Sequence, residues 1–570
     1  MAEDTTLNLL MVHADDHAPI LDEGLDDGAS QSHEREGQTL PEHYWDEGGD
    51  PNALDLQRWG VIAPEGERGD KLLALIEPLI KARQQQQGGD EVLVLRSPEK
   101  LSGPDAARWK KQVFQRAAAP EDLPRYQLIL GDLHEVPLSL QKTQANDGFV
   151  GRLAFDSDQD YESYVDKVLR WENKPTDFDK GSCIFHTVHD GTAATNVGYR
   201  SLVKPGLKFV RERHERGRFI AEDIIESGDR WDPSPDELLE AAQTDRPGVM
   251  FSLSHGDGPP RGGWDSHDHR LARQGAMSFG REGSLEGSDL RSATFLPGGV
   301  WFMLACFGAG TPGASAYHHW LEELRKVGQF RGKAETLLAG LPDDGDRPFI
   351  AQVPKAALSN PNGPLAFMGH IDLAWTYSFQ ELDAGVVNRP SKFTGILRSA
   401  LNRDRVGIAF RELYKFLNQT ESELAALYDE EASAGVSAGA AYQADVARRG
   451  HLWMLRQDLS AYILLGDPAA HLPIQNPRAP GQKKASSSAG LFGFGAPAAA
   501  PAASDTADTE AEELPLEDHD ELEEAIAKYI LGEDSPKALA KEYGVDRKAL
   551  KALSEKYQAA GRAALGMEEG

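Results

Sequence analysis

Short apolar runs alternate with amphipathic stretches along residues 59–130. The runs Gly60-Val-Ile-Ala63, Val92-Leu-Val-Leu95 and Gln127-Leu-Ile-Leu130 have the length and composition of buried strands. Between them, residues 69–87 and 104–118 place apolar side chains at helical spacing. The order strand, helix, strand, helix, strand predicts a parallel sheet that is covered by helices.

A second stretch of the same class begins near Gly181. It contains further buried-strand runs and predicted helices, and residues 349–353 are expected to form a short strand or an extended segment. The strands are expected at 183–188, 249–253, 300–305, 365–368 and 462–465, and the helices at about 201–216, 234–243, 314–326, 392–401, 406–431 and 436–458. We therefore expect two α/β subdomains, A over residues 59–178 and B over residues 179–477.

The two ends of the chain differ from this middle part. Residues 1–58 form an acidic arm without sustained periodicity, since residues 1–60 contain 15 Asp or Glu and only 2 Lys or Arg. This arm is either a solvated solubility tail, or a pro-segment or autoinhibitory arm. Residues 478–518 are a low-complexity linker rich in Ala, Pro, Gly and Ser. Residues 519–570 regain helical periodicity and predict a small helical module.

Charge and composition narrow the class of protein. The chain has 570 residues and a formal net charge of −31, which disfavours nucleic acid and anionic membranes as partners of the whole surface. Two cysteines cannot build a disulfide framework. No apolar run approaches the roughly 20 residues that span a bilayer, and the N-terminus shows no secretory pattern. We expect a cytoplasmic protein without a membrane partner.

Two predicted strands end in loops that carry reactive side chains. Ser254-His255-Gly256 follows one strand, and Cys306 follows another in a run of small residues. Catalytic groups collect at the carboxyl ends of parallel strands, and an imidazole can take the proton of a thiol nucleophile. The N–H groups of Gly256 and Cys306 are candidates for an oxyanion hole. The alternatives are a small core cysteine and a structural histidine, and Cys183, inside an apolar strand, is expected to be structural.

Several motifs, taken in chain order, resemble gingipain-like cysteine peptidases. Tyr126–Asp132 with Val136-Pro137 resembles their strand and turn, and Gly151–Glu172 resembles their GR…Y-V-x-K stretch. Ser254-His255-Gly256 and Ala305-Cys306 resemble the His-Gly and Cys boxes that caspases, legumains and gingipains share. Gly369–Trp375 and Leu464–Pro468 resemble bacterial members of the group, so that the resemblance covers roughly residues 59–475.

This resemblance implies a caspase-haemoglobinase fold, a three-layer α/β/α architecture of two adjacent subdomains with mostly parallel sheets. It also implies a cysteine endopeptidase that acts on protein or peptide substrates through a His255–Cys306 dyad, without a metal or organic cofactor. His255 and Cys306 are 51 positions apart, and the segment between them includes a longer loop than a compact member of the group would have. The alternative is a catalytically silent scaffold or regulator of the same fold.

The choice of substrate side chain depends, in this fold, on the loop after the first strand of the catalytic subdomain. Asp190 stands in that loop and Asp372 follows a later strand; a buried carboxylate at either position would select Arg or Lys at P1. Neither loop offers the arginine that an acidic P1 side chain would need. The alternative for Asp190 is a turn residue before Gly191.

Two further signals are weaker. His267, His269, His318 and His319 lack acidic or Cys partners at ligand spacing, so we expect no metal site. Ser535–Leu550 has the pattern of a helix-turn-helix with its turn at Tyr543-Gly544-Val545, and residues 536–562 contain 7 Lys or Arg and 3 Asp or Glu. This module could bind DNA or an unidentified protein partner. The linker segment Gln482-Lys-Lys-Ala485 is a candidate self-cleavage site if the enzyme accepts a basic P1 residue.

Overall fold

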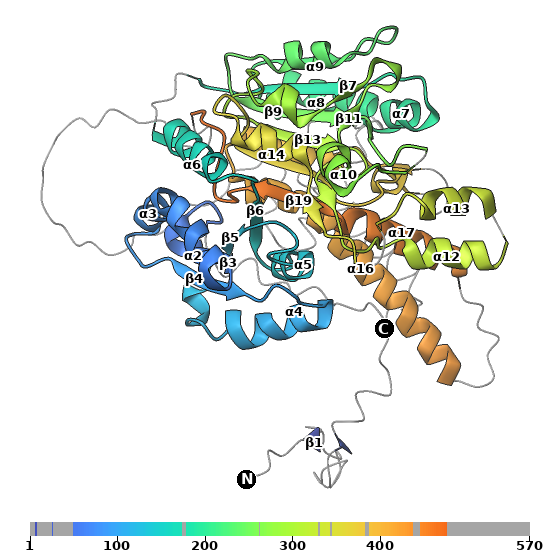
Figure 1. Cartoon of the computed structure of the whole chain (residues 1–570), viewed down its shortest axis with the longest axis horizontal. Helices are drawn as coiled ribbons and strands as arrows, with labels where there is room; N and C mark the ends of the chain where they lie inside the picture. The colour runs from blue at the N-terminus through green and yellow to red at the C-terminus, as the bar shows by residue number, and fades with distance from the viewer. Residues whose placement is uncertain are drawn as a thin grey trace, which may run out of the picture. The chain divides into compact units, whose positions relative to one another are not determined.

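The architecture is that of a computed structural model, which describes residues 6–7, 25–26, 50–173, 178–261, 263–328, 331–342, 345–381, 387–436 and 445–475 (Figure 1). The chain divides into two units, residues 1–482 and 483–570. The predicted linker, the helix-turn-helix-like module and most of the acidic arm lie outside the described residues.

A ten-stranded sheet forms the centre of the first unit. Its strand order is β4-β3-β5-β6-β19-β16-β13-β9-β7-β8, and every neighbouring pair is parallel except β16 and β19. The strands are β3 (Trp59–Pro64), β4 (Leu93–Ser97), β5 (Tyr126–Leu130), β6 (Phe149–Leu153), β7 (Ser182–Thr187), β8 (Ile224–Ser227), β9 (Gly248–Leu253), β13 (Val300–Leu304), β16 (Ala366–His370) and β19 (Tyr462–Gly466).

The strands of the two predicted subdomains occupy opposite ends of this sheet. β3 to β6 lie at one end, and β7, β8, β9, β13 and β16 lie at the other. β19 joins them, because it pairs parallel to β6 at Leu465 and Arg152 and antiparallel to β16. The strands of the two ends therefore point in opposite directions, and the loops after β7, β9, β13 and β16 gather at one edge of the sheet.

Helices cover both faces of the sheet (Figure 1). The helices of the described residues include α2 (Gly66–Leu75), α3 (Glu77–Gln86), α4 (Gly103–Trp109), α5 (Leu138–Ala145), α6 (Asp158–Asn173), α8 (Lys204–Glu215), α9 (Pro235–Ala242), α12 (His318–Lys326), α13 (Arg331–Leu338), α14 (Gln352–Ser359), α15 (Ser391–Leu401), α16 (Val406–Val436) and α17 (Val446–Ser460). No helix among the described residues is long and apolar enough to cross a membrane.

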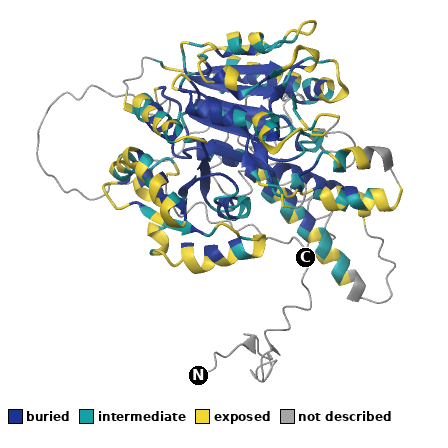
Figure 2. Ribbon diagram, viewed as in Figure 1, coloured by how far each residue is buried: buried dark blue, intermediate teal, exposed yellow. Residues whose placement is uncertain are grey.

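Two neighbouring residues of β13 show why both faces are closed. Successive side chains of a strand point to opposite faces. Phe302 packs edge to face on Phe393 of α15, whereas Trp301 packs on Phe295, whose backbone N–H donates to Asn362 just beyond α14. Apolar side chains therefore cover both faces of β13, and the central strands are buried along their whole length (Figure 2).

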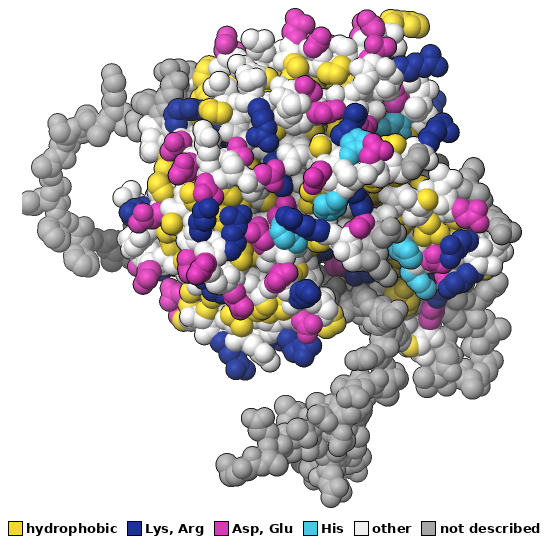
Figure 3. Space-filling model, viewed as in Figure 1, with side chains coloured by type: hydrophobic (Ala, Val, Ile, Leu, Met, Phe, Trp, Pro, Cys, Tyr) yellow, Lys and Arg dark blue, Asp and Glu magenta, His cyan; other side chains and the backbone are white. Residues whose placement is uncertain are grey.

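The structure confirms the predicted fold class, an α/β/α architecture around a mostly parallel sheet. The strand runs that the sequence predicts at 60–63, 127–130, 249–253 and 300–305 all belong to the sheet. The long loop expected between His255 and Cys306 contains the short helix α10 (His267–Arg273) and the small strands β11 (Met277–Ser278) and β12 (Ser284–Leu285). On the face that Figure 3 shows, basic and acidic side chains are interspersed.

Candidate active site

Four neighbouring strand ends meet where the sequence places its candidate chemistry. Asp190 follows β7, His255 lies in β10 (His255–Gly256) directly after β9, and Cys306 lies two residues beyond β13. The segment that begins at Ile371 follows β16. Since these strands lie in the order β16-β13-β9-β7, their loops are adjacent at one edge of the sheet.

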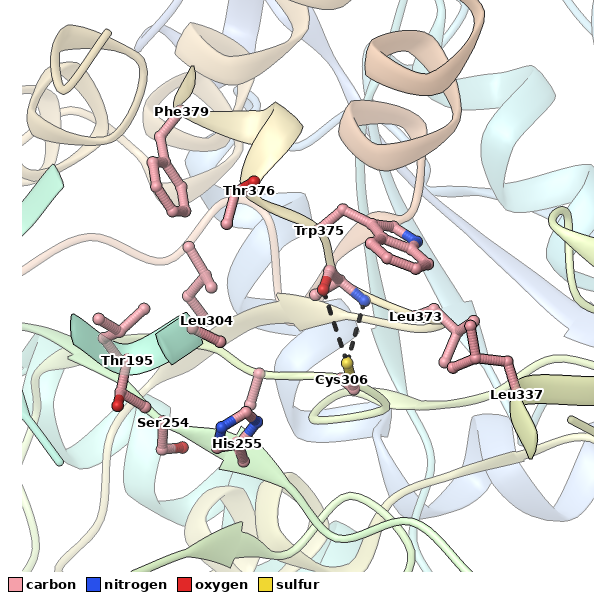
Figure 4. A pocket seen from close by; sticks show the side chains of 14 residues that line it. Thr195, Ser254, His255, Leu304, Cys306, Leu337, Leu373, Trp375, Thr376 and Phe379 are labelled. Carbon is pink, nitrogen blue, oxygen red and sulfur yellow. Dashed lines mark hydrogen bonds between the residues drawn. The ribbon is translucent and has the colours of Figure 1, made fainter. Parts of the chain in front are cut away.

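A pocket of about 270 Å³ opens between these loops. His255 and Cys306 both line it (Figure 4). The rest of the lining is mostly apolar: Ala194, Thr195, Leu253, Ser254, Leu304, Ala305, Leu337, Leu373, Ala374, Trp375, Thr376 and Phe379. The structure thus brings the two residues of the predicted dyad into one cavity.

The loop after β7 holds the His255 imidazole from behind. Thr192 Oγ1 lies 2.8 Å from His255 Nε2 in a hydrogen bond, and a carboxylate oxygen of Asp190 lies 3.7 Å from the same nitrogen. The imidazole side chain is 42% exposed, whereas the Asp190 carboxylate is only 3% exposed. A carboxylate in this place can orient the ring and stabilise its protonated form.

Local hydrogen bonds hold Asp190 in its charged form. Thr195 Oγ1 donates to Asp190 Oδ1 at 2.6 Å, and the backbone N–H of Thr192 donates to the same oxygen at 3.0 Å. Burial by itself would raise the pKa of Asp190, but the hydrogen bonds from Thr195 and Thr192 keep it below its ordinary value. The carboxylate is therefore ionised at neutral pH.

Cys306 is partly buried, and its sulfur contacts the segment that follows β16. The backbone N–H of Ala374 donates to Sγ at 3.2 Å, and Sγ lies 3.6 Å from the carbonyl oxygen of Ala374 (Figure 4). Burial raises the pKa of the Cys306 thiol to about 11, and the charges of Asp458 and Asp372 add to the effect. With this pKa the thiol is protonated at neutral pH, and in the described part of the chain no hydrogen bond joins it directly to His255.

Gly256 allows the segment after β9 to pack closely against the loop after β13. A Cβ atom at Gly256 would lie 1.9 Å from the carbonyl oxygen of Cys306, so that any other residue would push the loops apart. Phe307, the residue after Cys306, has a φ of 55°, in the left-handed region that side chains other than glycine seldom adopt. The sharp turn at Phe307 lets the chain leave the sheet directly after Cys306.

Asp372, the second candidate for substrate binding, does not line the pocket. Its carboxylate accepts hydrogen bonds from Ser315 Oγ and from the backbone N–H groups of Ala316 and Leu373, each at 2.8 Å. The residue is 3% exposed. Asp372 therefore fixes the loop after β16 and has no face toward a substrate.

Asp458 of α17 fixes the next part of the same loop. Its carboxylate accepts from the backbone N–H groups of Trp375 and Ser378 at 3.0 and 2.9 Å, and from Ser378 Oγ at 2.8 Å. Both carboxylates thus hold the pocket wall that Leu373, Trp375 and Thr376 form.

The remaining sequence candidates lie apart from this site. Cys183 is buried within β7, and burial raises its thiol pKa far above the ordinary value. His267 and His269 belong to α10, and His318 and His319 begin α12. Among the residues that the structure describes, no three His, Cys, Asp or Glu side chains come together to hold a metal ion.

Sequence reasoning missed Thr192, Thr195 and Ala374. It also identified no third residue beside the histidine; the structure places the buried Asp190 carboxylate 3.7 Å from His255 Nε2 and outside the pocket lining. The Asp-x-Thr-x-x-Thr spacing of Asp190, Thr192 and Thr195 could have indicated a local hydrogen-bonded turn. The contact of Ala374 with Cys306 leaves no trace in the sequence, because it depends on two loops 68 residues apart.

Comparisons with known proteins find similarity at the level of structure. No family model and no curated protein matches the chain. A solved structure of the Arg-specific cysteine proteinase gingipain R is similar over 76% of this chain and 80% of its own, with a TM-score of 0.42 and 11% identity. A complex of the pro- and mature domains of Porphyromonas gingivalis RgpB covers 73% of this chain and 79% of that chain, with a TM-score of 0.40 and 11% identity. The assignment of the site depends on this chain's own geometry.

Proposed function

We propose that this protein is a cysteine endopeptidase in which Cys306 is the nucleophile and His255 the general base and acid. The observation that carries the proposal is the shared pocket of Cys306 and His255 at neighbouring strand ends. The ionised Asp190 behind His255 supports it, because a carboxylate at this position holds the imidazole and favours its protonated form.

The proposed reaction proceeds by acyl transfer. His255 takes the thiol proton as Sγ forms a bond to the carbonyl carbon of the peptide. The resulting imidazolium gives this proton to the leaving amine as the C–N bond breaks, which leaves a thioester on Cys306. A water molecule then attacks the thioester carbonyl carbon as His255 takes one of its protons. The C–S bond breaks, the carboxylic acid is released, and His255 returns the proton to the Cys306 sulfur.

Two backbone groups are candidates to stabilise the oxyanion of this reaction, the N–H groups of Gly256 and Cys306. The close packing of Gly256 on Cys306 keeps these peptide groups near each other. Losing one oxyanion donor typically costs about 2.7–4 kcal/mol of transition-state stabilisation. These residues provide the whole proposed mechanism, which uses no metal or organic cofactor.

The resting thiol must change its contacts before it reacts. Burial raises its pKa to about 11 and keeps it protonated, although the N–H of Ala374, which donates to the sulfur, lowers that pKa. Rotation of the Cys306 side chain away from Ala374 is the smallest change that frees the sulfur. We expect a bound peptide to favour this rotation by occupying the pocket.

The preference for Arg or Lys at P1 has little support from the two carboxylates on which it depended. Asp372 is buried among its own donors, and Asp190 is turned toward His255 beneath Thr192 and Thr195. We therefore propose the peptidase activity without a basic-residue preference.

Two cysteine variants test the proposal. Wild-type protein is incubated with a mixed peptide pool, and cleavage is followed by mass spectrometry. Cys306→Ala should abolish cleavage, whereas Cys183→Ala should leave the rate within a factor of about two once folding has been checked by thermal unfolding. Equal loss in both variants would refute the assignment of Cys306.

A catalytically silent scaffold is the second candidate. It is favoured by the hydrogen bonds that hold the Cys306 sulfur to Ala374 instead of to His255. Under this alternative, no peptide in the pool is cleaved and the predicted C-terminal module binds DNA or a protein partner. A gel-shift measurement at stated salt concentration tests the DNA-binding form of this alternative.

A further inference from the structure

We infer that the pocket beside Cys306 accepts a bulky, uncharged apolar side chain, aliphatic or aromatic, at the P1 position of the substrate. This inference rests on the proposed peptidase activity and names its substrate class. It differs from the basic preference that the sequence predicts.

The position of the pocket connects it with P1. The residue whose carbonyl carbon the thiol attacks is P1, so its side chain must lie next to the sulfur. Cys306 and Ala305 are themselves part of the pocket lining. A cavity of about 270 Å³ is large enough for a leucine, methionine or aromatic side chain.

Apolar side chains form most of the walls. In the view of Figure 4, Leu304 and Phe379 lie on the side of His255, and Leu337, Leu373 and Trp375 lie around Cys306 on the other side. Burying a Leu or Phe side chain of a substrate against such walls is favourable. A substrate that lacks one methylene group in an apolar pocket of this kind typically loses about tenfold or more in kcat/KM.

The wall on the Cys306 side is itself held in place. Leu337, Leu373 and Trp375 pack against a buried cluster that includes Tyr317 and Leu321. Preformed walls suit a defined side chain, because little ordering is needed when it binds.

No carboxylate is placed to receive a cationic side chain among the described residues of the lining. His255 and Cys306 are the ionisable residues of the lining, and the Cys306 thiol is uncharged near neutral pH. Asp190 lies behind Thr195, whose hydroxyl donates to it, and Asp372 and Asp458 accept hydrogen bonds from the loop after β16. An Arg or Lys side chain in this pocket would be buried without an ionic partner, which is unfavourable.

Besides His255, Cys306 and the indole N–H of Trp375, the polar side chains of the lining are the neutral hydroxyls of Thr195, Ser254 and Thr376. Ser254 Oγ is buried and has no hydrogen-bond partner among the described residues. One hydroxyl can donate to a backbone carbonyl of the substrate, but it cannot neutralise a cation. The Ser254 hydroxyl is therefore compatible with a substrate whose P1 side chain is uncharged.

A peptide series tests the inference directly. The peptides share one sequence and differ only at P1, which is Leu, Phe, Met, Ala, Arg, Lys or Asp. We expect kcat/KM for Leu, Phe or Met to exceed that for Arg, Lys and Asp by at least about tenfold. Cleavage that needs Cys306 but is fastest after Arg or Lys would overturn the inference and leave the peptidase proposal intact.

A charge in the wall should reverse this preference. Leu337→Glu places a carboxylate in the pocket from the partly buried face of α13. We expect it to lower kcat/KM for Leu and to raise it for Arg, so that their ratio changes by at least about tenfold. Leu56→Glu is the matched control, because Leu56 is 53% exposed and belongs to α1 (Leu54–Gln57), outside the pocket lining. An unchanged ratio in Leu337→Glu would count against the assigned wall.

Binding without turnover separates failure of the inference from failure of the proposed function. Calorimetric titration of Cys306→Ala with the Leu and Arg peptides should show at least about tenfold tighter binding of the Leu peptide. Equal binding, tighter binding of the Arg peptide or no binding of either would overturn the pocket assignment. If the wild-type protein cleaves no peptide but the variant binds the Leu peptide selectively, the peptidase proposal fails and the apolar pocket remains.

Discussion

Cys183 and Cys306 are the two cysteines of the chain, and they differ in their surroundings. Cys183 is fully buried inside β7, whereas Cys306 is partly buried at the edge of the pocket beyond β13. Sequence alone could place both near strands, and the glycine-rich exit after Cys306 correctly indicated which one faces a cavity. Both residues have the same side chain, so we expect any difference in their reactivity to come from burial inside β7 as against exposure to the pocket beyond β13.

The thiol pKa of Cys306 leads to a prediction for alkylation. Only the thiolate reacts, and with a pKa of about 11 its fraction rises about tenfold for each pH unit below that value. Iodoacetamide labelling of the resting protein, followed by peptide mass analysis, should accelerate accordingly between pH 7 and pH 10. Cys183 should stay unlabelled in folded protein, which makes it the internal control. A labelling rate at Cys306 that no longer depends on pH above pH 7 would show that the resting sulfur is already ionised.

In the proposed mechanism, Asp190 is a positioning residue behind His255. Asp190→Asn keeps the shape and the acceptor for Thr195 but removes the negative charge 3.7 Å from His255. We expect kcat to fall by about tenfold or more while KM changes little, since the imidazolium loses its partner during the reaction.

The same variant distinguishes the two roles considered for Asp190. If the carboxylate instead binds a basic substrate side chain, Asp190→Asn should raise KM for Arg peptides and leave Leu peptides unaffected. That result would restore the interpretation drawn from the sequence.

At the scale of the element, the packing of β10 on the loop after β13 depends on Gly256. Gly256→Ala places a methyl group 1.9 Å from the Cys306 carbonyl oxygen. Overpacking of this kind costs about 1–3 kcal/mol, so we expect a lower melting temperature together with a large loss of kcat/KM. Gly258→Ala is the matched control, because no atom lies within 4 Å of a Cβ at Gly258. Equal activity in the two variants would show that this close approach is not needed.

The sheet could be predicted from the sequence wherever a strand forms a continuous apolar run. β6 could not be predicted in this way, because Gly151 and Arg152 interrupt its pattern. Gly151 is required where the carbonyl of Gly466 approaches, and the buried Arg152 donates to the carbonyls of Gly131 and Val136. Such polar groups are satisfied only by tertiary contacts.

Helix α14 could not be predicted for a related reason. The sequence suggested an extended segment up to Val353, but the helix runs from Gln352 to Ser359 and is buried nearly all round. Lys355 within it donates to Asp132 and Asp156. A helix without an exposed polar face lacks the periodicity that identifies amphipathic helices.

At the scale of the whole molecule, a buried ion network ties the N-terminal end of the sheet to the strand that joins both ends. Arg83 of α3 donates to Glu172 of α6 at 2.7 Å and to Asp467, the residue after β19, at 2.8 Å. Arg83 and Asp467 are both 0% exposed. Removal of the cation leaves two buried carboxylates without their partner.

Arg83→Leu should therefore destabilise the protein by about 3–5 kcal/mol in urea unfolding, because the desolvated Glu172 and Asp467 lose their counter-charge. Lys81→Ala serves as control on the same helix. Its ion pair with Glu77 is exposed, with side-chain exposures of 63% and 61%, and such pairs contribute about 0–1 kcal/mol. Similar unfolding free energies for both variants would contradict the structural importance of the network.

The central claim is that Cys306, with His255, forms a covalent intermediate with a peptide substrate. Acid quenching of wild-type protein shortly after mixing with a peptide ester, followed by mass analysis of its fragments, measures this directly. We predict an acyl adduct on the fragment that contains Cys306, and little adduct in His255→Ala. Turnover of the ester by Cys306→Ala at the wild-type rate, or an adduct on Cys183, would contradict the claim.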